Sequence, residues 1–193
     1  MMIDHAIILA AGASSRLGQP KALVKLHGKT LIELVDFRLR KMGLNVLVVT
    51  RSELKDKIAS ILKNSIIIIN PNPDAGRTGS IQCGLLEFQG KPILLVPIDR
   101  PGFSTSTLKL LINSKTTSCP TSNGIGGHPV AISIKDSKRI LDAHPDTPLR
   151  EIITPERLKV NDKNLHLNID TIDDLENLKS SLIMKSGDYF NEV

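Results

Sequence analysis

A glycine-rich loop that carries hydroxyls and cations follows the first apolar run of the sequence. The segment LAAGASSRLGQPK, residues 9–21, offers Gly12 and Gly18 for close approach of the backbone to a ligand. Backbone N–H groups in such a loop can form an anion-binding nest, and cations beside it would neutralise phosphate charge. The side chains that could do this are Ser14, Ser15, Arg16 and Lys21. The spacing is neither that of a Walker loop nor G-x-G-x-x-G, so a glycine-rich turn with solvated charges stays open beside a phosphate site.

Carboxylates in two other loops are candidates for a metal site. Asp99, in VPIDRPG, follows an apolar run and can ligate Mg²⁺, which bridges phosphate oxygens, or it can simply start a turn. Asp170, in NIDTIDDL, precedes a helix, where the capping preference of aspartate favours an N-cap. For Arg77 and His128 the favoured interpretations are a solvated loop charge and a turn into a strand. No Cys or His has the spacing of zinc ligands, so a metal here would be a hard ion.

Alternating strands and helices must position these residues. Strands are predicted at 5–11, 45–50, 65–70 and 92–98, and helices at 30–43, 52–64, 80–88 and 105–114. The first of these helices has Thr30 as N-cap, Glu33 in a capping box and Gly43 as its stop. Strands that are apolar throughout are buried on both faces. The pattern predicts a doubly wound α/β sheet, with ligands at the carboxyl ends of its strands. Residues 12–21, residues 71–80 and Asp99 all follow such strands.

The second half is less regular but continues the α/β pattern. We expect strands at 129–134 and 166–169, helices at 137–144 and 148–158, and a last helix from about Thr171. Asp173 and Asp174 would lie in its first turn, where the helix dipole favours them. The prediction is one domain over 1–193, with its core at about 3–184 and a frayed tail at 185–193.

Composition excludes several classes of function. The chain has 193 residues, of which 40% are hydrophobic and 23% charged, as in folded cytosolic proteins. No apolar run approaches the roughly 20 residues of a membrane helix, and an acidic residue stands where a signal peptide is basic. The net charge of +5 comes with only 3% aromatics, so nucleic-acid binding is not expected. We expect a cytoplasmic protein without disulfides, whose charge suits small phosphorylated substrates or solubility alone.

The string ILAAGASSRLGQPKAL resembles the signature of the MobA-like nucleotidyltransferases. Within them, it is most similar to the branch that includes molybdenum cofactor cytidylyltransferase. Four further segments resemble that branch in the same order, namely NPDAGRTGSIQCGL, VPIDRPG, GGHPV and NIDTIDDL. The resemblance spans from Ile8 to about Leu175. It implies a single-domain, Rossmann-like sandwich of the nucleotide-diphospho-sugar transferase type, with a mostly parallel, mixed central sheet.

The resemblance also implies roles for individual residues. The triphosphate would be bound by Gly12, Ser14, Arg16 and Lys21, the base and ribose by Gly76, Gly79 and Ser80, Mg²⁺ by Asp99 and Asp170, and the second substrate by His128. A phosphate oxygen of the acceptor would attack the α-phosphorus of an NTP and release pyrophosphate. Arg16 and Lys21 would neutralise the leaving group. An ionised acceptor phosphate needs no general base. Ala11 stands where guanylyltransferase relatives usually carry Gly, which favours CTP.

The chain departs from the family pattern at several positions. Asn168 stands where the family usually has Asp and Ile172 where it has Pro, which weakens the case for a second metal. The loop before Ser80 lacks the aromatic that is common there, so acceptor recognition can differ. The leading hypothesis is a cytidylyltransferase for a molybdopterin-type cofactor, with a molybdoenzyme as a possible partner. A transferase for sugar or polyol phosphates and a non-catalytic nucleotide-binding chaperone are the alternatives, and the presence of Arg16, Lys21 and Asp99 argues against the last.

Overall fold

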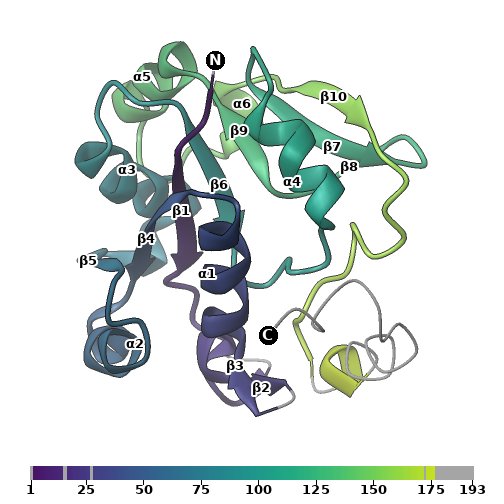
Figure 1. Cartoon of the computed structure of the whole chain (residues 1–193). Coiled ribbons are helices and arrows are strands. Elements are labelled where there is room, and N and C mark those ends of the chain that lie inside the picture. The colour runs from purple at the N-terminus through teal and green to yellow at the C-terminus, as the bar shows by residue number, and fades with distance from the viewer. Residues whose placement is uncertain (1, 15–16, 27, 172, 177–193) are drawn as a thin grey trace.

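A mixed β-sheet runs through the centre of the computed structural model, which describes residues 2–14, 17–26, 28–171 and 173–176 (Figure 1). Its parallel part, in the order β6-β1-β4-β5, consists of β6 (Ile93–Pro97), β1 (His5–Ala10), β4 (Asn45–Thr50) and β5 (Ile66–Ile69). Beyond β6 lie β9 (Val130–Ile132), antiparallel to it, then β7 (Ser118–Ser122) and β10 (Glu156–Lys159). The short β8 (Ile125–Gly126) pairs with β7. This agrees with the predicted mostly parallel, mixed sheet.

Helices cover both faces of the sheet, as a doubly wound fold requires. Along β1, Ile8 belongs to the core shared with α1 (Leu31–Lys41), α2 (Lys55–Ile61) and α4 (Thr105–Ile112). Its neighbour Ile7 points the other way, into the core shared with α3 (Arg77–Glu87), α5 (Ile134–Asp142) and α6 (Leu149–Ile152). Neither isoleucine is exposed to solvent. The apolar run of β1 is therefore explained by two buried faces.

The predicted start of α1 is confirmed in detail. The backbone N–H of Glu33 donates to Oγ1 of Thr30 at 3.4 Å, and the N–H of Thr30 donates to Oε2 of Glu33 at 2.7 Å. The Thr30 hydroxyl also donates to Oε2 of Glu33 at 2.6 Å, and this bond together with that from the Thr30 N–H lowers the pKa of the Glu33 carboxyl. At the other end, Gly43 has a φ of +79° and donates its N–H to the carbonyl of Arg40. A short hairpin of β2 (Lys25–Leu26) and β3 (Lys29–Thr30) leads into this helix.

Two predicted elements of the second half are wrong. The helix expected over 148–158 ends at Ile152, and residues 156–159 form β10 beside β7. Pro155 explains the change, because it disfavours helical backbone at the preceding residue and cannot continue the hydrogen-bonding pattern. The strand expected at 166–169 is a turn followed by irregular backbone.

Other boundaries differ in ways that affect the site. The helix expected at 80–88 begins three residues earlier, at Arg77, so Gly79 and Ser80 lie in its first turn and not in a loop. The helix expected at 52–64 is a 3-10 turn, η3 (Ser52–Leu54), followed by α2. β5 is an edge strand, and Ile66 is 46% exposed although the run was expected to be buried on both faces. β7 and β8 were not predicted at all.

At the C-terminal end, residues 173–176 are helical, in agreement with the predicted last helix. The predicted frayed tail at 185–193 lies outside the described residues, as does Ile172. Within the part of the chain that the structure describes, no helix is both long and apolar enough to cross a membrane.

Candidate active site

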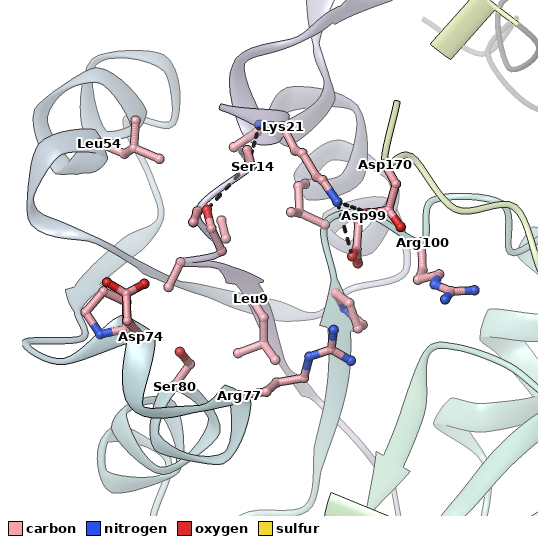
Figure 2. Close-up of a pocket in the computed structure, with 18 of the residues that line it drawn as sticks. Leu9, Ser14, Lys21, Leu54, Asp74, Arg77, Ser80, Asp99, Arg100 and Asp170 are labelled. Carbon is pink, nitrogen blue, oxygen red and sulfur yellow. Dashed lines mark hydrogen bonds and ion pairs between the residues drawn. The ribbon is translucent and has the colours of Figure 1, made fainter. Parts of the chain in front are cut away.

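A cleft of about 510 Å³ opens where the parallel strands β1, β4 and β6 end. Its walls come from the loop after β1, from η3, from the start of α3, from the segment after β6 and from the segment around residue 170. Figure 2 shows these side chains converging on one space. Because parallel strands present their carboxyl ends at the same edge, the sheet itself gathers residues that are far apart in sequence.

The loop after β1 is closed by Ser14. This residue has a φ of +53°, and its Oγ accepts a hydrogen bond from the backbone N–H of Lys21 at 3.1 Å. A Cβ built on Gly12 would meet no atom within 4 Å, so the backbone there borders open space in the cleft. Ser14 thus fixes the loop and Gly12 leaves room for a bound group. Ser15 and Arg16 lie outside the described residues.

Lys21, Asp99 and Asp170 meet on one side of the cleft (Figure 2). The Nζ of Lys21 lies 2.5 Å from Oδ1 of Asp170 and 3.6 Å from Oδ2 of Asp99. The backbone N–H of Ile169 donates to the carbonyl of Asp99 at 2.9 Å, which brings the two aspartates together. The three charged side chains are between 14% and 23% exposed. The structure places the three side by side. The N-cap interpretation of Asp170 is wrong, because Thr171 and not Asp170 accepts the N–H of Asp174.

This trio bears on whether a metal can bind. Both carboxylates face the same ammonium group, so a cation already occupies the space between them. Among the described residues there is no group of three or more His, Cys, Asp or Glu side chains that could hold a metal ion. Two hard oxygen donors fit Mg²⁺, which usually keeps several waters and takes one or two carboxylates together with phosphate oxygens.

Asn168 stands next to this trio. Its Nδ2 donates to Oδ2 of Asp170 at 2.5 Å, and its buried Oδ1 has no hydrogen-bond partner among the described residues. The amide therefore orients Asp170 without adding negative charge. From the sequence alone, Asn168 was notable only as a departure from the family pattern.

The start of α3 forms the opposite wall. Gly76, with a φ of +137°, and Ser80 line the cleft, and Ser80 accepts a hydrogen bond from Nδ2 of the buried Asn70 at 2.9 Å. Gly79 is turned toward Pro145 instead, whose carbonyl accepts its N–H at 3.0 Å. The close packing of residue 145 thus explains Gly79. The exposed side chain of Arg77 reaches into the cleft (Figure 2), although the sequence favoured a solvated loop charge for it.

A second hollow, of about 410 Å³, adjoins the cleft and shares Arg77 and Pro97 with it. His128 lines this hollow and not the cleft, and its Nδ1 is buried without a partner among the described residues. Burial, helped by the nearby charges of Arg77 and Arg100, lowers the pKa of His128 to about 4. The imidazole is therefore neutral near pH 7.

Three other residues of these walls were not singled out by sequence reasoning. Arg100 lines the cleft, and Cys119 and Arg150 line the second hollow. Arg100 directly follows Asp99, and that adjacency was an available signal. Cys119 belongs to the polar strand β7, which the sequence pattern did not define, and Arg150 to α6, the part of the expected helix that forms.

The chain matches the model of the MobA-like NTP transferase domain over residues 6–161. It belongs to this family. Among curated proteins, the MobA-like chain is 28% identical over 104 residues to the probable molybdenum cofactor guanylyltransferase of Bacillus cytotoxicus, covering 53% of this chain and 52% of that one. It is 32% identical over 111 residues to the molybdenum cofactor guanylyltransferase of Xanthomonas euvesicatoria pv. vesicatoria, covering 56% and 54%. The alignments thus span about half the length of these curated relatives.

Solved structures share the fold over nearly the whole chain. The homologue of Mycobacterium tuberculosis Rv0371c from Mycobacterium sp. strain JC1 matches with a TM-score of 0.79 at 25% identity, over 93% of this chain and 96% of that one. Rv0371c of M. tuberculosis in complex with manganese matches at 0.77 and 20%, over 94% and 100%. The inositol-1-phosphate CTP transferase of T. maritima matches at 0.74 and 16%, over 96% and 96%. The predicted nucleotide-diphospho-sugar transferase type of fold is confirmed.

Proposed function

We propose that this chain transfers a nucleoside monophosphate from an NTP to the phosphate of a molybdopterin-type acceptor, with release of pyrophosphate. The observation that carries the proposal is the meeting of Lys21, Asp99 and Asp170 in a cleft bordered by the Gly12 loop. A cation and two carboxylates beside an open glycine backbone suit a triphosphate with its Mg²⁺. Membership of the MobA-like family supports the same reaction.

The residues of the cleft would bind and align the nucleotide. The triphosphate would lie along the loop at Gly12, where the backbone borders open space, within reach of the Lys21 ammonium. Arg16, which lies outside the described residues, would add a second positive charge. Mg²⁺ between Asp99 and Asp170 would supply charge neutralisation at the phosphates. Alignment and charge stabilisation are the main contributions a protein makes to such a transfer.

The acceptor would occupy the second hollow, so that its phosphate reaches the cleft past Arg77. This arginine lines both spaces and is exposed enough to pair with an incoming phosphate. His128 is neutral near pH 7 and offers a hydrogen bond without a charge. No general base is required, because the attacking phosphate is already ionised at that pH.

The proposal also names which NTP and which acceptor the enzyme uses. Ala11 is 4% exposed and lines the cleft. Compared with glycine, its methyl group would leave less room in the cleft, which favours the smaller base of CTP. GTP is the second candidate, because the curated relatives are named guanylyltransferases. A sugar or polyol phosphate is the second candidate acceptor, since an inositol-1-phosphate CTP transferase shares this fold. With a molybdopterin acceptor, a molybdoenzyme would receive the product.

The test is pyrophosphate release with Mg²⁺ and each of CTP, GTP, ATP and UTP, with and without molybdopterin. We expect release with CTP that requires the acceptor. The Asp99→Ala variant should keep its far-UV circular dichroism and lose at least about 10²-fold in rate, a typical cost of removing a transition-state charge partner. Release only with a sugar or polyol phosphate would change the acceptor. Binding of NTP without any turnover would favour the chaperone alternative, and equal activity in Asp99→Ala would disprove the metal assignment.

A further inference from the structure

We propose that Lys21 is an internal counter-ion that closes the Asp99–Asp170 pair to divalent cations until the NTP binds, so that metal and nucleotide bind together. This inference rests on the proposed function, because it assigns the lysine's second partner to the triphosphate. It concerns the nucleotide-free protein. In this role Lys21 does more than bind phosphate, because it also prevents the metal from binding before the nucleotide.

The first argument is geometric. The Nζ of Lys21 lies 2.5 Å from Asp170 and 3.6 Å from Asp99, so the ammonium stands where a cation shared by both carboxylates must stand. Oδ2 of Asp170 is also engaged, by the side-chain amide of Asn168 at 2.5 Å. Both oxygens of Asp170 therefore already have donors from this chain. The dashed lines of Figure 2 trace the two ion pairs of the lysine.

The second argument is electrostatic. The three side chains are at most 23% exposed, so their charges are only partly hydrated. The two carboxylates bring two negative charges to this space, and the Lys21 ammonium offsets one of them. Removing one partner of a partly buried ion pair leaves charge uncompensated. A divalent cation that approaches the nucleotide-free site therefore meets a pair that is already neutralised in part, and it must compete with the attached lysine.

The third argument concerns where Lys21 can go. Its backbone N–H is held by Oγ of Ser14 at 3.1 Å, at the start of η2 (Lys21–Leu23), so the main chain stays beside the phosphate loop. The ammonium sits at the end of a flexible four-carbon stem. A triphosphate lying along Gly12 offers it a more highly charged partner. Turning the stem toward that partner releases both aspartates, while phosphate oxygens supply the ligands that two carboxylates cannot.

Asn168 keeps this balance. An aspartate at 168 would add a third negative charge beside Asp170 and would strengthen the attraction of this site for a divalent cation. The neutral amide instead donates to Asp170 and leaves the pair within the reach of one lysine.

The experiment measures binding of Mn²⁺ alone, by electron paramagnetic resonance of the free ion, to the full chain. Wild type should bind Mn²⁺ weakly by itself and at least about tenfold more tightly with a non-hydrolysable CTP analogue, a tenfold change corresponding to about 1.4 kcal/mol. Lys21→Met and Lys21→Gln should bind Mn²⁺ without nucleotide about tenfold more tightly than wild type. Asn168→Asp should shift in the same direction. Lys63→Met, which removes an exposed lysine on the segment between α2 and β5, should match wild type.

Thermal unfolding gives a readout that does not depend on activity. Mn²⁺ alone should raise the Tm of the Lys21 variants and leave that of wild type unchanged, because a cation stabilises only the state that binds it. Adding Asp170→Asn to Lys21→Met should abolish both effects. If the folded Lys21 variants bind Mn²⁺ no more tightly than wild type, the inference is wrong, although nucleotide-dependent binding in wild type would leave the proposed function standing. If wild type binds no Mn²⁺ even with the analogue, the metal assignment of the proposed function falls as well.

Discussion

We propose that a single methyl group, that of Ala11, contributes to the choice of base in the cleft. Ala11 closes the end of β1 and is almost fully buried in the wall of the cleft. One methyl or methylene group in a binding pocket typically changes discrimination by about 10- to 200-fold. We predict that Ala11→Gly lowers the ratio of kcat/KM for CTP to that for GTP by about tenfold. The ratio should be measured by pyrophosphate release with both nucleotides in competition.

The matched control is Ala59→Gly, which makes the same change at an exposed position of α2. It should leave the ratio unaltered even where it lowers stability, because glycine weakens any helix by about 1 kcal/mol relative to alanine. An unaltered ratio in Ala11→Gly would show that the base is selected elsewhere, and the start of α3 would become the next wall to vary.

The sequence could predict side chains better than it could predict their partners. Residue type and position identified Lys21, left Asp99 open between a metal ligand and a turn, and favoured an N-cap for Asp170, which only the family resemblance placed in the site. The three do lie together. The two aspartates are linked by a backbone hydrogen bond from the N–H of Ile169 to the carbonyl of Asp99. These residues are 70 positions apart, so no local pattern reveals the contact. For the same reason, interpreting Arg77 as a solvated loop charge did not anticipate that it lines both the cleft and the second hollow. An exposed arginine gives no local signal of what lies beside it.

At the scale of elements, the start of α3 depends on its contact with the loop after α5. A Cβ on Gly76 would lie 2.9 Å from the carbonyl oxygen of Pro145, and the φ of +137° is itself unfavourable for other residues. We predict that Gly76→Ala lowers the free energy of unfolding by about 2–4 kcal/mol, combining backbone strain with overpacking. It should also raise KM for the NTP, since the helix start lines the cleft. Urea unfolding at constant m-value measures the first effect.

Gly90→Ala separates strain from contact. Gly90 also has a positive φ, +72°, but a Cβ there meets nothing within 4 Å. Its substitution should cost only about 1–2 kcal/mol, the usual penalty of left-handed backbone, and should leave KM unchanged. Equal losses of stability in the two variants would contradict the role given to the contact with Pro145.

Elements whose signal is local were predictable, and those defined by their neighbours were not. The apolar runs of β1, β4 and β6 and the capping box of α1 specify themselves. By contrast, β7 has the sequence SCPTS and is a strand because β9 and β10 pair with it. β10, with the sequence ERLK, was assigned to a helix for the same reason. Hydrophobic periodicity cannot reveal a polar strand that owes its conformation to its pairing.

At the scale of the molecule, the reversal of strand direction in the sheet separates two spaces. The cleft borders the parallel strands β1 and β6, whereas the second hollow has residues of β7 and β9 in its wall. The change from parallel to antiparallel pairing occurs between β6 and β9. Pro97, the last residue of β6, lines both spaces. A sheet of this topology can hold a nucleotide on one side of β6 and an acceptor on the other, with their phosphates meeting at its end.

The stability of the whole molecule should depend on pH through His128. Its pKa is about 4 in the folded protein and 6.5 in an ordinary environment, so between these values the unfolded chain binds more protons than the folded one. The stability that the neutral His128 contributes is therefore fully present above pH 6.5, and it is lost as the pH drops toward 4. With each pKa unit worth about 1.4 kcal/mol, we predict that wild type loses about 2 kcal/mol more than His128→Gln between pH 7 and pH 4.5.

Urea unfolding of both proteins at several pH values in this range measures the difference. Because His128 is already neutral near pH 6.5, it does not titrate there. The dependence of the rate on pH should therefore have the same shape near pH 6.5 in wild type and in His128→Gln. If wild type and His128→Gln lose stability in parallel, the imidazole is hydrated in solution. The second hollow would then be open to water at its histidine.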